Sequence, residues 1–300
     1  MTRSTPTPAS IGEQSAHPAR LPSEATPFTP SARPAVEIRP LRTMQECATC
    51  VDLQREVWGF GDSEVVPATL LHVVDYVGGL AAGAFDAAGE MVGFVFGVSG
   101  VRNGELVHWS HMLAVRESTR NHGLGRMLKE YQRATMARLG VTKISWSFDP
   151  LMAKNAYFNF DRLGASVVEY VPDMYGTTAS PLHLGLPTDR LVVAISTSAV
   201  ILDRPVARND QLPILSPFPR EGDDIVRPGD REPDAMLLEV PPDILDVIQR
   251  APAAARKWRI AVREHFQWAL AHGYDVASVR RELATNREFY VLRKAAAKVP

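Results

Sequence analysis

Cysteine is scarce in this chain, and long hydrophobic runs are missing altogether. The 300 residues include 2 cysteines, too few for a small fold held together by several disulfides. No stretch approaches the ~20 apolar residues of a membrane helix, and no apolar run near the start is long enough for a signal-peptide core. We therefore expect a cytoplasmic protein with no membrane partner.

An excess of charge of one sign is also lacking. Lysine and arginine number 33, aspartate and glutamate 34, and the formal net charge is −1. Such a chain has no bulk field to attract nucleic acid, so we expect no nucleic-acid partner. Any affinity for phosphate must come from a local site.

The two cysteines form one Cys-x-x-Cys pattern, Cys47 and Cys50, inside a helical pattern from Met44 to Trp58. A zinc site would need a second pair or matching histidines, and a redox motif would need a helix start after a strand. We therefore expect two buried or half-buried thiols and no metal.

Proline-rich stretches divide the chain into four segments. We expect residues 1–34 to be a disordered tail, 35–198 one α/β domain, and 199–235 an irregular linker. Residues 236–300 should form a strand–helix–strand extension packed on that domain.

The helix expected in the extension has two distinct sides. An apolar stripe at helical spacing should face a core, and it consists of Trp258, Val262, Phe266 and Ala269. A second side carries Arg256, Arg259 and Arg263. We expect this second side to be a solvated basic face.

The most informative stretch is Val115–Arg126. An apolar strand pattern ends there, a helix pattern follows, and the loop between them reads Arg120-x-x-Gly123-x-Gly125. Glycines let the backbone come close to a ligand, and a helix start offers unpaired N–H groups that favour an anion. The arginines add positive charge suited to phosphate. The pattern predicts a diphosphate-binding loop.

This loop resembles the acetyl-CoA signature of the GNAT N-acetyltransferase superfamily, which reads Gln/Arg-x-x-Gly-x-Gly/Ala. Leu113-Ala114-Val115 stands where that family ends its fourth strand, and Leu163-Gly164-Ala165 where it has a Leu-Gly-Phe step. The order of expected strands and helices over about residues 35–198 is also similar. The resemblance implies an α/β (α+β) fold: a mixed, mostly antiparallel sheet with splayed fourth and fifth strands, flanked by helices.

The resemblance also implies a co-substrate and an activity. Acetyl-CoA would be bound, without a metal, by the end of the fourth strand and the following loop: Leu113, Ala114, Val115, Arg120, Asn121, His122, Gly123, Leu124, Gly125 and Arg126. The implied activity is N-acyl transfer to a small-molecule amine by a monomer or homodimer. One alternative is a GNAT-fold protein that binds acyl-CoA without transferring the acyl group. Another is different acyl-CoA chemistry in the same site.

Three residues are candidates for catalysis. His111 lies on the expected strand Glu105–Val115 and can accept the proton of an ammonium substrate. Asp149, at the exit of the next strand, is a second candidate base, or a charge that holds the ammonium. Tyr175 lies in a long polar loop that the resemblance places beside the acceptor pocket.

Strand alternation makes a prediction about Glu105–Val115. It puts Trp109, His111 and Leu113 on one face of the strand. The other face would carry His108, Ser110 and Met112.

One residue departs from the family pattern. GNAT enzymes commonly have a tyrosine four residues before the glycine of the Leu-Gly-Phe step, where it protonates the leaving thiolate. That position is Phe160 here, and we expect a tyrosine at this position to be neutral or activating. Either another group such as Tyr157 or Tyr175 substitutes for it, or CoA leaves as a thiolate, or the chain does not transfer acetyl at all. His183 and Asp189 are further polar candidates in the loop.

Overall fold

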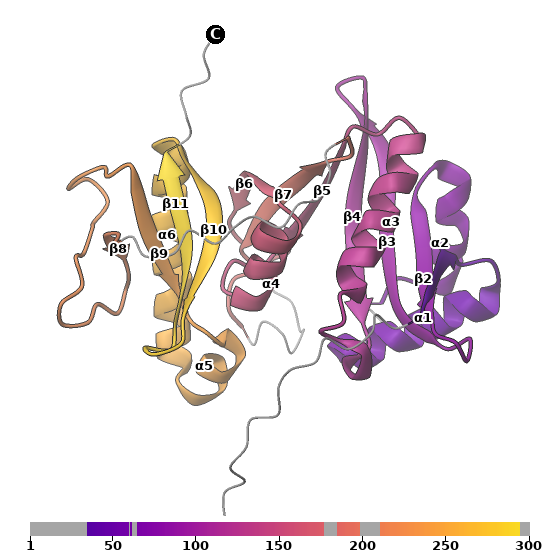
Figure 1. Ribbon diagram of the computed structural model, residues 1–300, viewed down its shortest axis with the longest axis horizontal. Helices are drawn as coiled ribbons and strands as arrows, with labels where there is room; N and C mark the ends of the chain where they lie inside the picture. The colour runs from indigo at the N-terminus through magenta and orange to yellow at the C-terminus, as the bar shows by residue number, and fades with distance from the viewer. Residues whose placement is uncertain (1–34, 60, 62–64, 177–184, 199–210, 295–300) are drawn as a thin grey trace, which may run out of the picture. The chain divides into compact units, whose positions relative to one another are not determined.

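The computed structural model describes residues 35–59, 61, 65–176, 185–198 and 211–294 (Figure 1). The expected tail 1–34, the candidate His183 and the first part of the expected linker, 199–210, lie outside the described residues. Residues 33–300 form one compact unit.

The first sheet has seven strands. Their order across the sheet is β1 (Glu37–Pro40), β2 (Leu80–Phe85), β3 (Met91–Arg102), β4 (Glu105–Val115), β5 (Lys143–Phe148), β7 (Arg190–Ser196) and β6 (Ser166–Val171). Every neighbouring pair is antiparallel except β4 and β5, which are parallel. This mixed, mostly antiparallel sheet confirms the predicted fold class.

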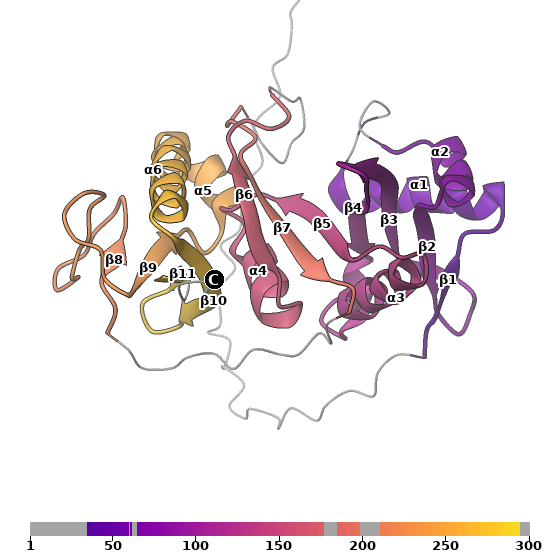
Figure 2. The ribbon, with the colours of Figure 1, turned by 90° about the horizontal axis from the view of Figure 1, so that it is seen from above.

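Helices cover both faces of strands β1–β4 (Figure 2). The helices α1 (Met44–Trp58) and α2 (Ala68–Val73), with the 3-10 turn η1 (Val74–Val77), lie on one face. On the other face lies α3 (Leu124–Arg138), preceded by the 3-10 turn η2 (Glu117–Thr119). The side chain of Thr43 caps α1 in a reciprocal capping box with Glu46.

The two cysteines of α1 are buried between this helix and the sheet. Cys47 and Cys50 are free thiols with no exposed surface. Burial raises the pKa of both thiols, so they stay protonated and unreactive at neutral pH. The prediction of two buried or half-buried thiols is confirmed.

A widened turn interrupts the helix that follows β5. The sequence predicts one helix over Ala153–Leu163, but α4 (Ala153–Tyr157) continues as a π turn, η3 (Phe158–Arg162). Within this turn, Asn159 Oδ1 accepts a hydrogen bond from Trp146 Nε1 at 3.1 Å. The π turn thus ties α4 to β5.

The extension forms a second sheet. Its strand order is β10 (Tyr274–Glu282), β11 (Arg287–Lys294), β9 (Ala235–Val240) and β8 (Ile214–Leu215), with the helices α5 (Ile244–Arg250) and α6 (Pro252–Ala271). The sequence predicted β9, α6 and β11 but missed α5, β10 and β8. The strand β8 lies in the segment expected to be an irregular linker.

One hydrophobic core joins the extension to the first sheet. The predicted apolar stripe of α6 is buried in it, at Trp258, Val262, Phe266 and Ala269. The rings of Phe160 and Tyr290 meet edge to face with centroids 6.0 Å apart, and Tyr290 meets Phe266 at 4.9 Å. The extension therefore packs directly against the π turn after β5.

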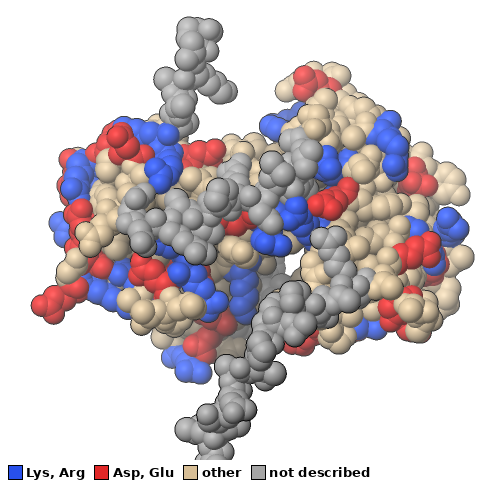
Figure 3. All heavy atoms as spheres, viewed as in Figure 1, with Lys and Arg blue, Asp and Glu red and all other residues tan. Residues whose placement is uncertain are grey.

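The surface carries both signs of charge. Figure 3 shows basic and acidic side chains interspersed over the visible face, in keeping with the formal net charge of −1. No helix in the described part of the chain is both long and apolar enough to cross a bilayer.

Candidate active site

The parallel strands β4 and β5 separate after a short contact. Their register pairs only His108 with Ile144 and Trp109 with Ser145. Beyond Trp109 and Ser145 the strands run apart (Figure 1), and we call this opening the fork. The separated edges leave backbone N–H and C=O groups that an extended ligand can pair with as an added strand.

The loop Arg120–Arg126, which we call the cradle, leads from β4 into α3. Gly123 is the N-cap residue of α3 with φ 80°, a left-handed conformation that favours glycine, and no side chain in the described chain caps the helix. At Gly125, an added Cβ would lie 3.4 Å from Phe158 Cζ and 3.6 Å from Leu113 Cδ2. Open N–H groups beside a narrow groove suit an anion with an extended tail.

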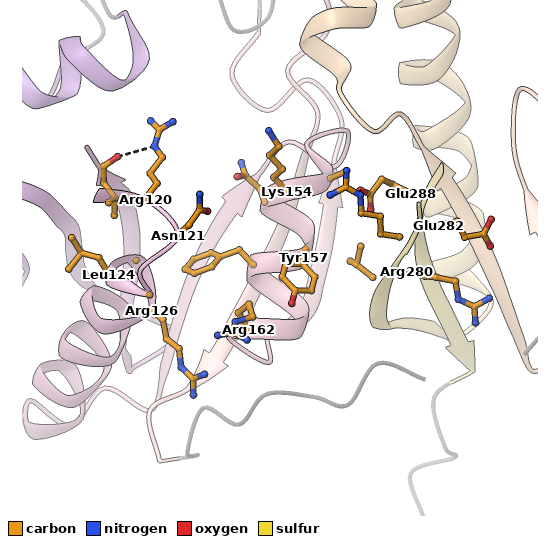
Figure 4. Close-up of a pocket in the computed structure, with 18 of the residues that line it drawn as sticks. Arg120, Asn121, Leu124, Arg126, Lys154, Tyr157, Arg162, Arg280, Glu282 and Glu288 are labelled. Carbon is orange, nitrogen blue, oxygen red and sulfur yellow. Dashed lines mark hydrogen bonds and ion pairs between the residues drawn. The ribbon is translucent and has the colours of Figure 1, made fainter. Parts of the chain in front are cut away.

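A cavity of about 1270 Å³ extends from the cradle past α4 to the second sheet. In Figure 4, Arg120, Asn121, Leu124 and Arg126 line one side, α4 and its π turn contribute Lys154, Tyr157 and Arg162, and the second sheet contributes Arg280, Glu282 and Glu288. The Arg120 Nε donates a hydrogen bond to the Val115 carbonyl at 3.1 Å. The cavity has basic side chains near the cradle and both signs of charge near the second sheet. Among the described residues, no three or more His, Cys, Asp or Glu side chains are grouped as a metal ion requires.

Three features together identify the fold: the order of the seven strands, the one parallel pair that opens into the fork, and the cradle at the start of the helix after β4. It is the GNAT fold. No protein-family model matches the chain, and no curated protein matches it.

Solved structures with similar folds include three acetyltransferase-related proteins. The ribosomal-protein-S18-alanine N-acetyltransferase from Escherichia coli is 18% identical, with a TM-score of 0.42, and the match covers 55% of this chain and 96% of that one. The aminoglycoside 6'-acetyltransferase type Ii is 22% identical, with a TM-score of 0.42 and 56% and 99% covered. The yncA protein from Salmonella typhimurium, solved with its cofactor acetyl-CoA, is 16% identical, with a TM-score of 0.43 and 57% and 98% covered.

A β-bulge lies in the GNAT-fold sheet at the fork. Phe96 pairs with Met112, but the next residue, Gly97, pairs with Ser110. His111 is therefore the extra residue of β4, without a partner position on β3. It is exposed, and its ring meets the edge of the Phe96 ring with centroids 6.0 Å apart.

The bulge changes which side chains share a face. Leu113 and Val115 pack on the α3 side with the core that also holds α4, whereas Met112 and Ala114 pack on the α1 side. Ser110 also faces α3, through its hydrogen bond to a lysine of that helix. The predicted grouping of Trp109, His111 and Leu113 against His108, Ser110 and Met112 is therefore wrong beyond Ser110, because one extra residue shifts the alternation.

Of the predicted catalytic candidates, His111 lies on β4 at the fork, and Tyr175 reaches the neighbouring strand β5 from the turn after β6. Although His111 keeps exposed surface, desolvation of its ring lowers the pKa, so the imidazole is neutral near neutral pH and can accept a proton. The Tyr175 hydroxyl lies 3.2 Å from the Oγ of Ser147, a residue of β5. The Arg190 guanidinium lies 5.2 Å from the Tyr175 ring centroid. Ser147 follows Trp146, which contacts α3, so alternation puts Ser147 and Tyr175 on the opposite face.

Asp149, the third predicted catalytic residue, is engaged elsewhere. Its Oδ1 and Oδ2 accept hydrogen bonds from Arg259 of α6 at 2.9 and 2.5 Å, and Oδ1 also accepts one from the Leu151 N–H at 2.8 Å. A carboxylate whose two oxygens are both engaged by a buried guanidinium is not free to act as a general base for a substrate. The expected solvated basic face is wrong at Arg259, which is 1% exposed.

Asp189 has a similar structural role. It accepts hydrogen bonds from the Tyr170 hydroxyl at 2.7 Å and from Arg263 Nε at 2.9 Å. Burial alone would raise its pKa, but the bonds from Arg263 and Tyr170 outweigh burial and lower it. The ion pairs of Arg259 and Arg263 thus fasten α6 to the end of β5 and the start of β7.

A buried polar network on the α3 side of the fork was missed by the sequence reasoning. Lys129 Nζ donates hydrogen bonds to Ser110 Oγ at 2.7 Å and to Gln132 Oε1 at 3.2 Å. It also lies 4.0 Å from the centroid of the Trp146 ring. Burial lowers the pKa of Lys129 to about 7.

The network continues away from the fork through a histidine. Gln132 Nε2 lies 3.0 Å from His108 Nε2, and His108 Nδ1 lies 2.9 Å from Ser99 Oγ. Burial and the charge of Lys129 lower the pKa of His108 to about 4, which keeps its ring neutral. The sequence does contain a signal for this network. Lys129 and Gln132 lie on the same side of α3 as the apolar residues Leu124, Leu128 and Met136, which is the side that faces the core.

Proposed function

We propose that the protein transfers an acyl group, in the simplest case acetyl, from acyl-CoA to a small-molecule amine. The observation that carries this proposal is the continuity of the fork and the cradle. The separated edge of β4 leads, through η2 and the cradle, into the start of α3. One ligand that joins a diphosphate to an extended amide-containing arm can therefore use both.

The residues that would hold acyl-CoA follow from this geometry. The backbone N–H groups at the start of α3, with Arg120 and Arg126 beside them, would bind the diphosphate. The backbone of Leu113, Ala114 and Val115 would pair with the amides of the arm. The bound thioester supplies an activated acyl group at the fork.

The opposite side of the fork would receive the amine. His111 would take the proton of the substrate ammonium, directly or through water, because its lowered pKa keeps the imidazole neutral. A backbone N–H of β4 at the bulge would be the group to stabilise the oxyanion. The Tyr175 hydroxyl at Ser147 would contact the acceptor from the β5 side.

A second candidate function is acyl-CoA binding without transfer. Phe160 favours it, because the residue is fully buried between the rings of Phe148 and Tyr290 and has no proton to give. The two candidates differ in turnover. Free-thiol release from acetyl-CoA, measured over a panel of amines, should depend on protein and amine together if transfer occurs. Tight binding of acetyl-CoA with no thiol release over the panel would contradict the proposal in favour of binding alone.

Ligand binding at the cradle can be tested separately. Acetyl-CoA at 100-fold over its dissociation constant should stabilise the fold by about 2.7 kcal/mol, and Gly123→Trp and Gly125→Trp should abolish this gain. The matched control is Gly104→Trp, because Gly104 has the same φ of 80° as Gly123 and an equally open Cβ position, but lies in the β3–β4 turn. An undiminished gain in both cradle variants would place the acyl-CoA site elsewhere.

A further inference from the structure

Lys129 lies at the closed end of the fork. The last paired positions of the two strands are Trp109 on β4 and Ser145 on β5. The next residue on each strand is Ser110 and Trp146, and both contact Lys129 Nζ, at 2.7 Å to the hydroxyl and 4.0 Å to the ring centroid. The amine therefore lies where the two strands begin to separate.

The surroundings of this amine hold a cation poorly. Its partners are the neutral groups Ser110, Gln132 and Trp146, and the shift of its pKa has burial as its cause, with no carboxylate contributing. The hydrogen-bond network also links Lys129, through Gln132, to a titratable group on β4. That group is His108, whose ring is neutral.

The charged groups on neighbouring turns of α3 have other partners. Arg126 forms an ion pair with Glu130 at 2.9 Å, and Arg133 donates to the Thr197 carbonyl at 2.8 Å. The Lys129 amine is thus set up to exchange a proton near neutral pH, rather than to form a structural ion pair.

The position also fits the length of the bound arm. Ser110 precedes Val115 by five residues, or roughly 16 Å along an extended strand. That is the order of length of an extended pantetheine arm that starts from the cradle. Since Leu113 and Val115 of β4 pack on the same core as α3, an arm that leaves the start of α3 along this side of β4 would enter the fork on the face where Lys129 lies.

We propose that Lys129 is the acid that protonates the departing CoA thiolate, a role that rests on the proposed acyl transfer. The amine nitrogen of the acceptor forms a bond to the acyl carbon as the C–S bond breaks with its electron pair going to sulfur. The proton lost by the acceptor passes to His111 or water, and the ammonium of Lys129 gives a proton to sulfur. His111 then releases its proton to water and Lys129 regains one, so the protein returns to its starting state.

This assignment accounts for the phenylalanine at position 160. The hydroxyl of a tyrosine at position 160 would lie among the aromatic rings that join the π turn to the second sheet. The acid comes instead from α3, on the other side of the same core.

The test compares Lys129→Met with Lys143→Met, a change of the same residue type at an exposed position at the start of β5. Each is assayed with acetyl-CoA and with its seleno analogue, whose more acidic selenol leaves without needing a proton. Lys129→Met should lower kcat with the thioester by ~10²-fold, lower it far less with the selenoester, and remove the fall in kcat as pH rises through the pKa of the amine. Lys143→Met should change none of these.

Two further measurements exclude a purely structural effect. The stabilisation by acetyl-CoA should be the same in Lys129→Met and the unaltered protein, and NMR of labelled lysine ε-carbons should show one amine that titrates far below 10.5. An equal loss with both donors, or full turnover by Lys129→Met, would overturn the role of Lys129 and leave the proposed function intact. Absence of thiol release by the unaltered protein with every amine would overturn both.

Discussion

Substituting the buried lysine by methionine should change how stability depends on pH. The folded state holds the Lys129 amine with a pKa of about 7, against an ordinary value of 10.5. Between these two values the unfolded chain binds more protons than the folded chain, so the free energy of unfolding rises with pH. Methionine has a similar length and no proton, and therefore lacks this contribution.

The expected size follows from the two pKa values. One differentially bound proton changes the free energy of unfolding by about 1.4 kcal/mol per pH unit. From about pH 6.5 to about pH 8.5 the unaltered protein should therefore gain about 2 kcal/mol relative to Lys129→Met. Above this window, burial raises the pKa values of Cys50 and Tyr290, and those groups act in the opposite direction. They are common to both proteins and cancel in the difference.

Urea unfolding at several pH values, with a constant slope on denaturant, measures this difference. Lys143→Met is the control, and its difference from the unaltered protein should not vary with pH. If the Lys129→Met difference also stays constant between about pH 6.5 and about pH 8.5, the amine keeps its ordinary pKa on folding. The reasoning about a poorly compensated cation at the fork would then be refuted.

Four other substitutions test three separate features. Asp149→Asn and Arg259→Met should each lower the free energy of unfolding by ~3–5 kcal/mol, because one partner of a buried ion pair is left uncompensated; a double-mutant cycle by urea unfolding that shows no coupling would contradict this. Phe160→Tyr should destabilise by ~1–3 kcal/mol and leave turnover no higher, because the new hydroxyl enters an aromatic cluster; activation without loss of stability would support the sequence-based expectation instead. His111→Ala should lower kcat by ~10²–10⁴-fold while acetyl-CoA still raises Tm; unchanged kcat would remove His111 from the mechanism.

The first sheet and the cradle were predictable because their signals are local. The bounds of β4 and β5 follow from apolar runs, and a threonine directly before the helical pattern that begins at Met44 marks the cap at Thr43. Gly123 and Gly125 marked a turn whose backbone conformation and close contacts are visible in the structure. For such elements, neighbouring residues carry enough information.

The faces of β4 and the role of Asp149 were not predictable in the same way. The bulge at His111 depends on the register with β3, which strand alternation alone cannot reveal. Asp149 and Arg259 are 110 residues apart, and each alone reads as an ordinary polar residue. The missed strand β10 pairs with β11 across a register shift near Val276 and alternates with charged residues, which weakens its apolar pattern.

The ion pair between the end of β5 and α6 also sets an order of events during synthesis. Asp149 leaves the ribosome 110 residues before Arg259, and at about 5–20 residues per second that delay is about 5–20 s. During this time the carboxylate must remain in water, so the end of β5 cannot be enclosed as it is in the finished protein. The side of the fork formed by β5 is therefore completed only after α6 has been made, and the nascent chain carries its cradle before it has a finished active site.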